Sequence, residues 1–227
     1  MINNGHHQVT ALVPSRPTKP ASRTYPYIGT ALTPDAQITA IENSFRDIMV
    51  ALGLDIHDDS LTRTPHRFAK MLVNEVFDGL DRRRFPEITT QDNKFGYSEP
   101  LCEANISIIS TCEHHFVPII GRCHIAYIPA GRLIGLSKLN RIARHLARRP
   151  QVQERLTIQI AETLAELVET DDVAVTVDAE HLCVKMRGIE DVNAVTRTTE
   201  LKGAFQQSDV RKEYFAAIPR LSDLKSI

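Results

Sequence analysis

The sequence has few cysteines, no excess of either charge and no long apolar run. Four cysteines in 227 residues are too sparse for a disulfide scaffold, so in a reducing compartment their thiols are expected to be structural, catalytic or metal-binding. Lys and Arg total 27 against 28 for Asp and Glu, which gives a net charge of −1. This balance argues against a general nucleic-acid binder, although it allows a local basic cluster around a small anion.

No apolar run approaches the roughly 18 residues that span a bilayer, and the N-terminus lacks the charged and then apolar plan of a signal peptide. We therefore expect a soluble, cytoplasmic protein with neither a membrane nor a nucleic acid as partner. The chain is 42% hydrophobic and 24% charged. Its length and composition suit one large domain with a sizeable core.

The first 32 residues differ in composition from the rest. They carry several prolines among Ser, Thr, Asn and Gly with little apolar periodicity, which predicts a flexible tail over 1–32. A single domain is expected over 33–227. Two helices are predicted to lead it, over 33–80, because Thr33-Pro34 and Thr64-Pro65 each place a capping residue before a proline.

The core of the domain is expected over 100–220. Alternation over 105–108 and 123–128 predicts two paired strands joined by a loop over 112–121. The elements predicted next are helices opened by Ser137 and by Pro150, strands over 173–177, 181–187 and 196–201, and a closing helix over 209–218. This order indicates an α+β fold, with the helices packed on one side of an antiparallel sheet.

Two short segments carry residues that bind metals. Residues 112–115 read Cys-Glu-His-His, and residues 181–183 read His-Leu-Cys. Zinc favours thiolate and imidazole ligands, and a catalytic zinc site keeps one position open for water. A loop can aim Cys112 and His115 at one ion, and Cys183 offers a third ligand.

The remaining histidines leave alternatives open. In a strand, His181 and Cys183 point to the same face, so His181 and His114 are available as proton carriers beside a metal. Either one is equally available as the fourth ligand of a closed structural zinc site. A set of buried thiols and hydrogen-bonded histidines without any metal is a third interpretation.

Basic residues at a predicted helix start suggest an anion site. Ser137, Lys138 and Arg141 lie where free backbone N–H groups and the helix dipole favour phosphate. Arg67 and Arg187 offer fork-shaped donors for phosphate oxygens. More often, basic residues of this kind simply form a solvent-exposed basic surface.

Gln153 and Glu154 follow Pro150 at the start of a predicted helix. A carboxylate accepts two parallel hydrogen bonds, which matches the N–H edge of a guanine-type base. An exposed first-turn Glu that complements the helix dipole is the simpler interpretation.

Taken together, these segments resemble the signature blocks of GTP cyclohydrolase I. The similarity covers about 34–218 in the right order and spacing. The blocks are Thr-Pro-His-Arg at 64–67, Ser-Thr-Cys-Glu-His-His-Phe-Val-Pro at 110–118, Gly-Leu-Ser-Lys-Leu at 135–139, Arg-Pro-Gln-Val-Gln-Glu-Arg-Leu at 149–156 and His-Leu-Cys-Val-Lys-Met-Arg-Gly at 181–188.

The resemblance implies three groups of site residues. The implied ligands of a catalytic Zn²⁺ ion are Cys112, His115 and Cys183. The implied catalytic residues are His114, His181 and Ser137. The implied GTP-binding residues are Gln153 and Glu154 at the guanine ring, and Arg67, Lys138, Arg141 and Arg187 at the triphosphate.

The resemblance also implies a fold, an assembly and a reaction. The family has the tunnelling fold, with a four-stranded antiparallel sheet, and forms a homodecamer with active sites at subunit interfaces. Its enzymes convert GTP and water to 7,8-dihydroneopterin triphosphate and formate, which feeds folate or other pterin synthesis. A non-catalytic relative that binds GTP or a pterin is the alternative, and its sign would be the loss of a ligand or histidine.

Overall fold

The computed structural model describes residues 26–220, which divide into two compact units with a boundary after Val73. Residues 26–32 contain neither helix nor strand, and the rest of the predicted tail lies outside the described residues. Among the described helices, none combines the length and the apolar character needed to cross a membrane.

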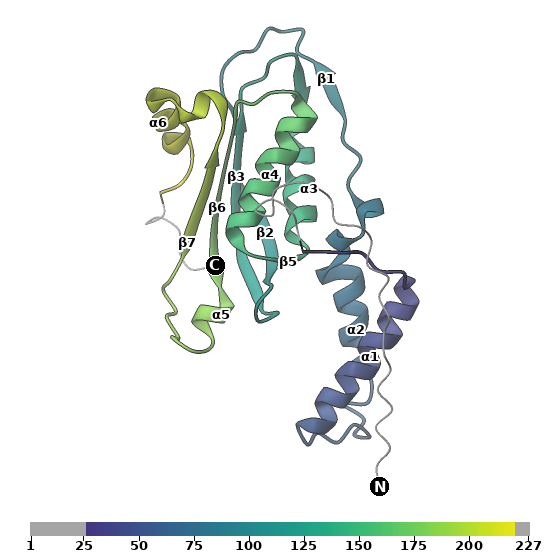
Figure 1. Cartoon of the computed structure of the whole chain (residues 1–227). Helices are drawn as coiled ribbons and strands as arrows, with labels where there is room; N and C mark the ends of the chain where they lie inside the picture. The colour runs from purple at the N-terminus through teal and green to yellow at the C-terminus, as the bar shows by residue number, and fades with distance from the viewer. Residues whose placement is uncertain (1–25, 221–227) are drawn as a thin grey trace. The chain divides into compact units, whose positions relative to one another are not determined.

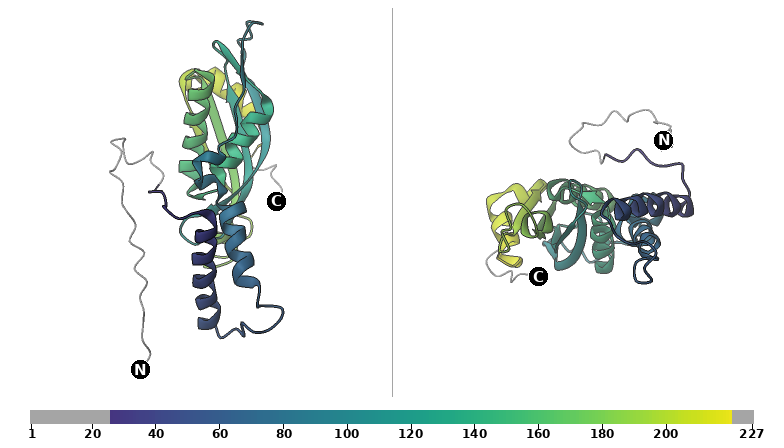
Figure 2. Two further views of the ribbon diagram at one scale, coloured as in Figure 1. Left: turned by 90° about the vertical axis from the view of Figure 1, so that its right-hand side faces the viewer. Right: turned by 90° about the horizontal axis from the view of Figure 1, so that it is seen from below.

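The first unit contains two helices, α1 (Pro34–Ala51) and α2 (Thr64–Met71), which pack side by side (Figure 2). The rings of Phe45 and Phe68 stack with centroids 3.9 Å apart and join the two helices. This aromatic contact stabilises the pair, and α2 in particular depends on such packing because a helix of eight residues is marginal alone.

Only one of the two predicted N-caps is present. The Thr33 side chain accepts a hydrogen bond from the backbone N–H of Ala36, and Pro34 occupies the first turn of α1, as predicted. At the second helix the prediction is wrong, because Arg63 is the capping residue and makes no side-chain bond, while Thr64 lies inside the helix.

The second unit is built on a five-stranded sheet in the order β5-β2-β3-β6-β7. Its neighbours pair antiparallel except that β5 runs parallel to the end of β2. The strands are β2 (Leu101–Cys112), β3 (Pro118–Tyr127), β5 (Pro150–Gln151), β6 (Val173–His181) and β7 (Thr196–Leu201). A second, two-stranded sheet pairs β1 (Thr90–Asp92) with β4 (Arg132–Ile134).

Two helices, α3 (Leu136–Ala147) and α4 (Gln153–Val168), cover one face of the large sheet (Figure 1). Alternate residues of β6, such as Val173, Val175 and Val177, point into the apolar core beneath them. The shorter helical segments are a π-helical turn at Leu72–Val76 and 3₁₀ turns at Asp78–Leu80, Arg82–Arg84 and Gly203–Gln206.

The prediction that all helices pack on one side of the sheet is wrong. The closing helix, α6 (Ser208–Ala217), contributes Tyr214 to a second apolar cluster with Phe205, Ala126 and Ala174. The two alanines are paired across β3 and β6, and they alternate with the residues that face α3 and α4. Residues on both faces of β6 are buried. The sequence of this strand therefore does not indicate on which face of the sheet α6 packs.

Two element boundaries also differ from the prediction. The loop expected over 112–121 is shorter, because β2 continues to Cys112 and β3 begins at Pro118. The strand expected over 181–187 is a helical turn, α5 (Leu182–Lys185), closed by a 2.9 Å bond from the Met186 N–H to the Leu182 carbonyl. The alternating polar residues of this segment are compatible with either structure.

The two predicted helix starts in the core are also displaced. Gly135, not Ser137, is the N-cap of α3 and makes no side-chain bond. Pro150 belongs to β5, and α4 begins at Gln153. The register of Pro150 against Thr111 of β2 holds this end of α4 beside the end of β2, where the candidate site lies.

Candidate active site

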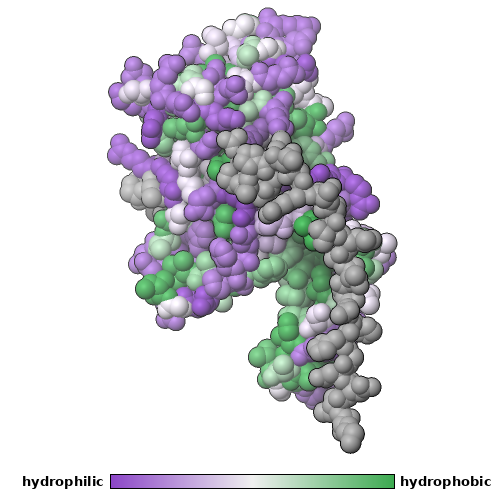
Figure 3. All heavy atoms as spheres, viewed as in Figure 1, coloured by the Kyte–Doolittle hydropathy of each residue, from purple (hydrophilic) through white to green (hydrophobic). Residues whose placement is uncertain are grey.

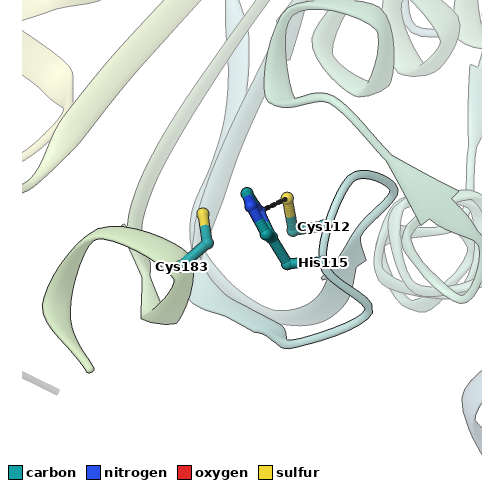
Figure 4. Close-up of side chains that lie close together, drawn as sticks. All are labelled: Cys112, His115 and Cys183. Carbon is teal, nitrogen blue, oxygen red and sulfur yellow. Dashed lines mark hydrogen bonds between the residues drawn. The ribbon is translucent and has the colours of Figure 1, made fainter. Parts of the chain in front are cut away.

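Cys112, His115 and Cys183 converge from the end of β2, from the β2–β3 loop and from α5 (Figure 4). Their ligand atoms all lie within 4.8 Å of one another, and Cys112 Sγ is 3.9 Å from His115 Nδ1. Zinc bonds of about 2.3 Å to sulfur and about 2.0 Å to nitrogen place tetrahedral ligand atoms roughly 3.6 Å apart. A small closure of this group therefore suits a zinc ion, and its two thiols and one imidazole are donors that zinc prefers.

The turn that carries Cys112 and His115 is held by its own backbone hydrogen bonds. The Cys112 N–H donates to the Val117 carbonyl and the Phe116 N–H donates to the Cys112 carbonyl, both at 2.8 Å. Phe116 takes a left-handed conformation with φ 54°, an uncommon state for a residue with a side chain. The reversal that results folds His115 back over Cys112.

A partly buried ion pair fastens the same turn to α4. Arg155 donates two hydrogen bonds to the Glu113 carboxylate, at 2.6 and 3.1 Å, and the Glu113 N–H donates to the Gln151 carbonyl at 3.0 Å. The bonds from Arg155 hold the pKa of Glu113 below its usual value. Sequence reasoning missed Arg155, and only its place in the first turn of the helix after Gln153 hinted at it.

Neither of the two remaining histidines joins the metal-binding group of the described residues. His114 Nδ1 lies 3.9 Å from Cys112 Sγ, but its side chain is mostly exposed. His181 is the last residue of β6 and is half-buried, with Nε2 2.7 Å from Gln153 Oε1. Burial lowers the pKa of His181, and the nearby charge of Glu154 opposes that shift. Three protein ligands would leave one coordination position of a tetrahedral zinc ion open.

The predicted guanine-binding pair divides between two environments. Glu154 is exposed in the first turn of α4, on the side of the site that His181 occupies. Gln153 is buried, and its amide bonds to other parts of the protein. Only the carboxylate is therefore free to meet a ligand in solution.

The residues predicted at the start of α3 lie away from the metal-binding group. Ser137 and Arg141 are exposed there, and Lys138 Nζ donates to the Glu87 carbonyl at 2.7 Å. The same part of α3 lies beside the beginning of β2, because Asn140 contacts Glu103 at 3.3 Å.

Cys112 is the last residue of β2 and Glu103 is the third, so the two residues are separated by most of the length of the strand, roughly 25–30 Å at about 3.3 Å per residue. The start of α3 and the metal-binding group therefore lie toward opposite ends of β2.

The two predicted arginines also differ in their surroundings. Arg187 Nη1 donates to His115 Nε2 at 2.8 Å; because a guanidinium only donates, Nε2 accepts and the ring proton lies on Nδ1. Arg187 thus lies next to the metal-binding group. Arg67 is exposed on α2, in the other unit.

Known proteins are similar to this chain over the part that contains these site residues. The family model for GTP cyclohydrolase I matches residues 41–219. The chain is 52% identical over 196 residues to a protein named GTP cyclohydrolase 1 from Aeromonas hydrophila subsp. hydrophila, covering 86% of this chain and 90% of the relative.

Two further relatives carry the same name. The protein from Flavobacterium johnsoniae is 49% identical over 183 residues, which is 81% of this chain and 82% of the relative. The protein from Vibrio cholerae is 52% identical over 183 residues, which is 81% of this chain and 84% of the relative. The family model spans both the metal-binding turn and α5, the named relatives match over most of the chain, and the chain therefore belongs to the GTP cyclohydrolase I family.

Proposed function

We propose that this enzyme of the GTP cyclohydrolase I family holds zinc with Cys112, His115 and Cys183 and converts GTP and water to 7,8-dihydroneopterin triphosphate and formate. The observation that supports the proposal is the convergence of two thiols and one imidazole, whose ligand atoms lie within 4.8 Å of one another. The reaction is the first step of folate or pterin synthesis, and we place it in the cytoplasm.

A zinc ion bound there would supply Lewis acidity and lower the pKa of a coordinated water. The residues of the chain supply the rest. Opening the imidazole ring of the purine requires protons at its nitrogens, and His181 and His114 are the neighbouring groups that exchange protons near neutral pH. Ser137 is proposed to act near the ribose.

Both acidic and basic side chains are proposed to bind the substrate. The exposed carboxylate of Glu154 accepts the N–H edge of the guanine ring, and the cationic side chains Arg67, Lys138, Arg141 and Arg187 hold the triphosphate. In the structure the guanidinium of Arg187 is bonded to His115 Nε2 at 2.8 Å. Release of that bond would free the guanidinium for phosphate oxygens.

We further propose that the site is shared between subunits of a homodecamer with the family's tunnelling fold, four antiparallel strands of the sheet and the helix pair α1 and α2. The separation between Cys112 and the start of α3 supports a shared site. So do the large apolar side chains exposed near the metal-binding group, Phe116, Met186, Ile189 and Val192. Figure 3 shows apolar surface at the lower left of the second unit, where α5 lies in Figure 1. A neighbouring subunit would cover it.

Subunit mixing tests the shared site. Cys112→Ser removes a metal ligand, and Arg141→Ala removes a phosphate donor, so each variant alone is expected to be inactive. Random reassembly of equal amounts restores both halves in about a quarter of the sites of a symmetric ring. Recovery of about that fraction of GTP turnover supports the proposal. No recovery in mixed oligomers, verified with two affinity tags, would contradict it.

The non-catalytic alternative is not favoured, because no predicted ligand or histidine is missing and the named relatives match over most of the chain. Incubation of the zinc-loaded protein with GTP separates the two. The proposal expects formate and a pterin in equal amounts. Binding of GTP without either product would support the alternative instead.

A further inference from the structure

The side-chain amide of Gln153 is enclosed by the protein. Gln153 opens α4 and is 2% exposed. Its Nε2 donates to the Val177 carbonyl at 2.9 Å and to the Thr196 carbonyl at 3.0 Å. Its Oε1 lies 2.7 Å from Nε2 of His181. One amide therefore ties α4 to β6, to β7 and to the imidazole at the end of β6.

The partners of this amide determine where the proton of the imidazole lies. Backbone carbonyls only accept hydrogen bonds, so the Val177 and Thr196 carbonyls require the –NH₂ group on their side. The amide oxygen of Gln153 must then face His181. Because that oxygen only accepts, His181 Nε2 carries the proton. In the neutral ring, Nδ1 is left with the free electron pair.

Two hydroxyl groups lie beside the same amide, whose orientation the two carbonyls already determine. Thr157 Oγ1 donates to the Gln153 carbonyl at 2.9 Å and lies 2.6 Å from Thr198 Oγ1. Since the Thr157 proton is already used, Thr198 donates to Thr157. The Thr198 oxygen in turn accepts from Gln153 Nε2 at 3.1 Å. The two N–H groups of Gln153 thus share three acceptors on the side away from His181, which agrees with the orientation that the two carbonyls require.

We propose that Gln153 is a positioning residue that fixes His181 as the Nε2–H tautomer, so that Nδ1 is the atom through which His181 exchanges protons with the substrate. This inference rests on the proposed function for the role of His181. It replaces the expected contact between Gln153 and the guanine ring, since both N–H groups are used within the protein and the side chain is buried.

Kinetics separate the two roles. Gln153→Met keeps the length of the side chain but removes both the donor and the acceptor. A positioning role predicts that kcat falls at least about tenfold, because a well-placed acid–base group contributes about 10²–10⁴-fold, while KM for GTP changes less than about threefold. Thr198→Val is the matched control, because it removes one hydroxyl acceptor and leaves both carbonyls and the His181 contact. A raised KM with unchanged kcat in Gln153→Met would overturn the proposal.

A spectroscopic readout tests the tautomer directly and without turnover. The full-length, zinc-loaded protein is labelled with ¹⁵N-histidine and studied by solid-state NMR, and the His181 signals are assigned by their loss in His181→Asn. We expect the Nε2–H form alone in the parent and in Thr198→Val, and a mixture with the Nδ1–H form in Gln153→Met. A single Nε2–H form in Gln153→Met would refute the proposal, whereas missing products from GTP would refute only the proposed function.

A second variant keeps the proposal testable if Gln153→Met fails to fold. Gln153→Glu retains an acceptor for His181 Nε2–H while losing both donors. The proposal predicts that Gln153→Glu keeps the Nε2–H tautomer and retains more of kcat than Gln153→Met, with oligomer size unchanged. Conversion of His181 to the Nδ1–H form in Gln153→Glu would overturn it.

Discussion

Arg155→Met is expected to weaken zinc binding although Arg155 is not a ligand. The substitution keeps an apolar stem but removes both hydrogen bonds to Glu113, which sits between the ligand Cys112 and the turn to His115. The Arg155 and Glu113 side chains are 17% and 22% exposed, so the pair is partly shielded from water.

The size of the effect follows from these contacts. Hydrogen bonds to charged groups contribute about 1.5–3 kcal/mol, but partial exposure and the remaining bond from the Glu113 N–H to Gln151 reduce the loss. We expect the turn to lose about 1–2 kcal/mol, and 1.4 kcal/mol corresponds to about tenfold in an equilibrium constant. Zinc affinity should therefore fall about tenfold, at the lower end of the 10–100-fold typical of residues that orient metal ligands.

Competition between the apoprotein and a chromophoric zinc chelator measures this affinity. Arg148→Met is the matched control, since Arg148 also forms an ion pair, with Asp78, but its side chain is 50% exposed and it is not bonded to the metal-binding turn. The reasoning is refuted if Arg155→Met binds zinc as tightly as the parent, or if Arg148→Met loses as much affinity as Arg155→Met.

Three further predictions concern the ligands, the substrate contact and stability. Cys112→Ser and Cys183→Ser should each lose zinc and formate release, and full zinc content by elemental analysis in both would contradict the ligand assignment. Glu154→Ala should raise KM for GTP at least about tenfold, the loss of a charged hydrogen bond, with zinc retained; an unchanged KM would remove its role at the guanine ring. Burial and the nearby Arg149 charge lower the pKa of His145 to about 4. As pH falls, His145 is therefore protonated in the unfolded chain at a higher pH than in the folded protein. His145 should therefore cost about 2 kcal/mol of stability between pH 7 and 5, and His145→Met should flatten the fall in urea midpoint over that range; an unchanged slope would contradict the shift.

The candidate metal ligands were predictable because their chemistry is local. Cys112 and His115 are three residues apart in a segment with a further histidine, His114, and Cys183 follows His181 by two residues. Their ligand atoms lie within 4.8 Å of one another, and their role as metal ligands stays a prediction. The route of the chain was not predictable to the same degree, since the polar alternation after His181 fits both a strand and the helical turn of α5.

The contacts that support the site depend on tertiary neighbours. In the sequence, Gln153 and Glu154 are equivalent polar residues at a helix start. In the fold, Gln153 is buried against β6 and β7, while Glu154 stays exposed. The position of α6 was missed for a similar reason, because small residues such as Ala126 and Ala174 pack equally well under a helix on either face of the sheet.

Zinc titration of the metal-free protein in the presence of GTP tests the central claim most directly. Zinc bound per chain, formate and pterin are followed together in the parent and in Cys183→Ser. The account predicts that formate and pterin rise in equal amounts and stop rising at one zinc per chain, and that Cys183→Ser forms neither. Equal turnover in the metal-free protein, or full turnover by Cys183→Ser, would contradict it.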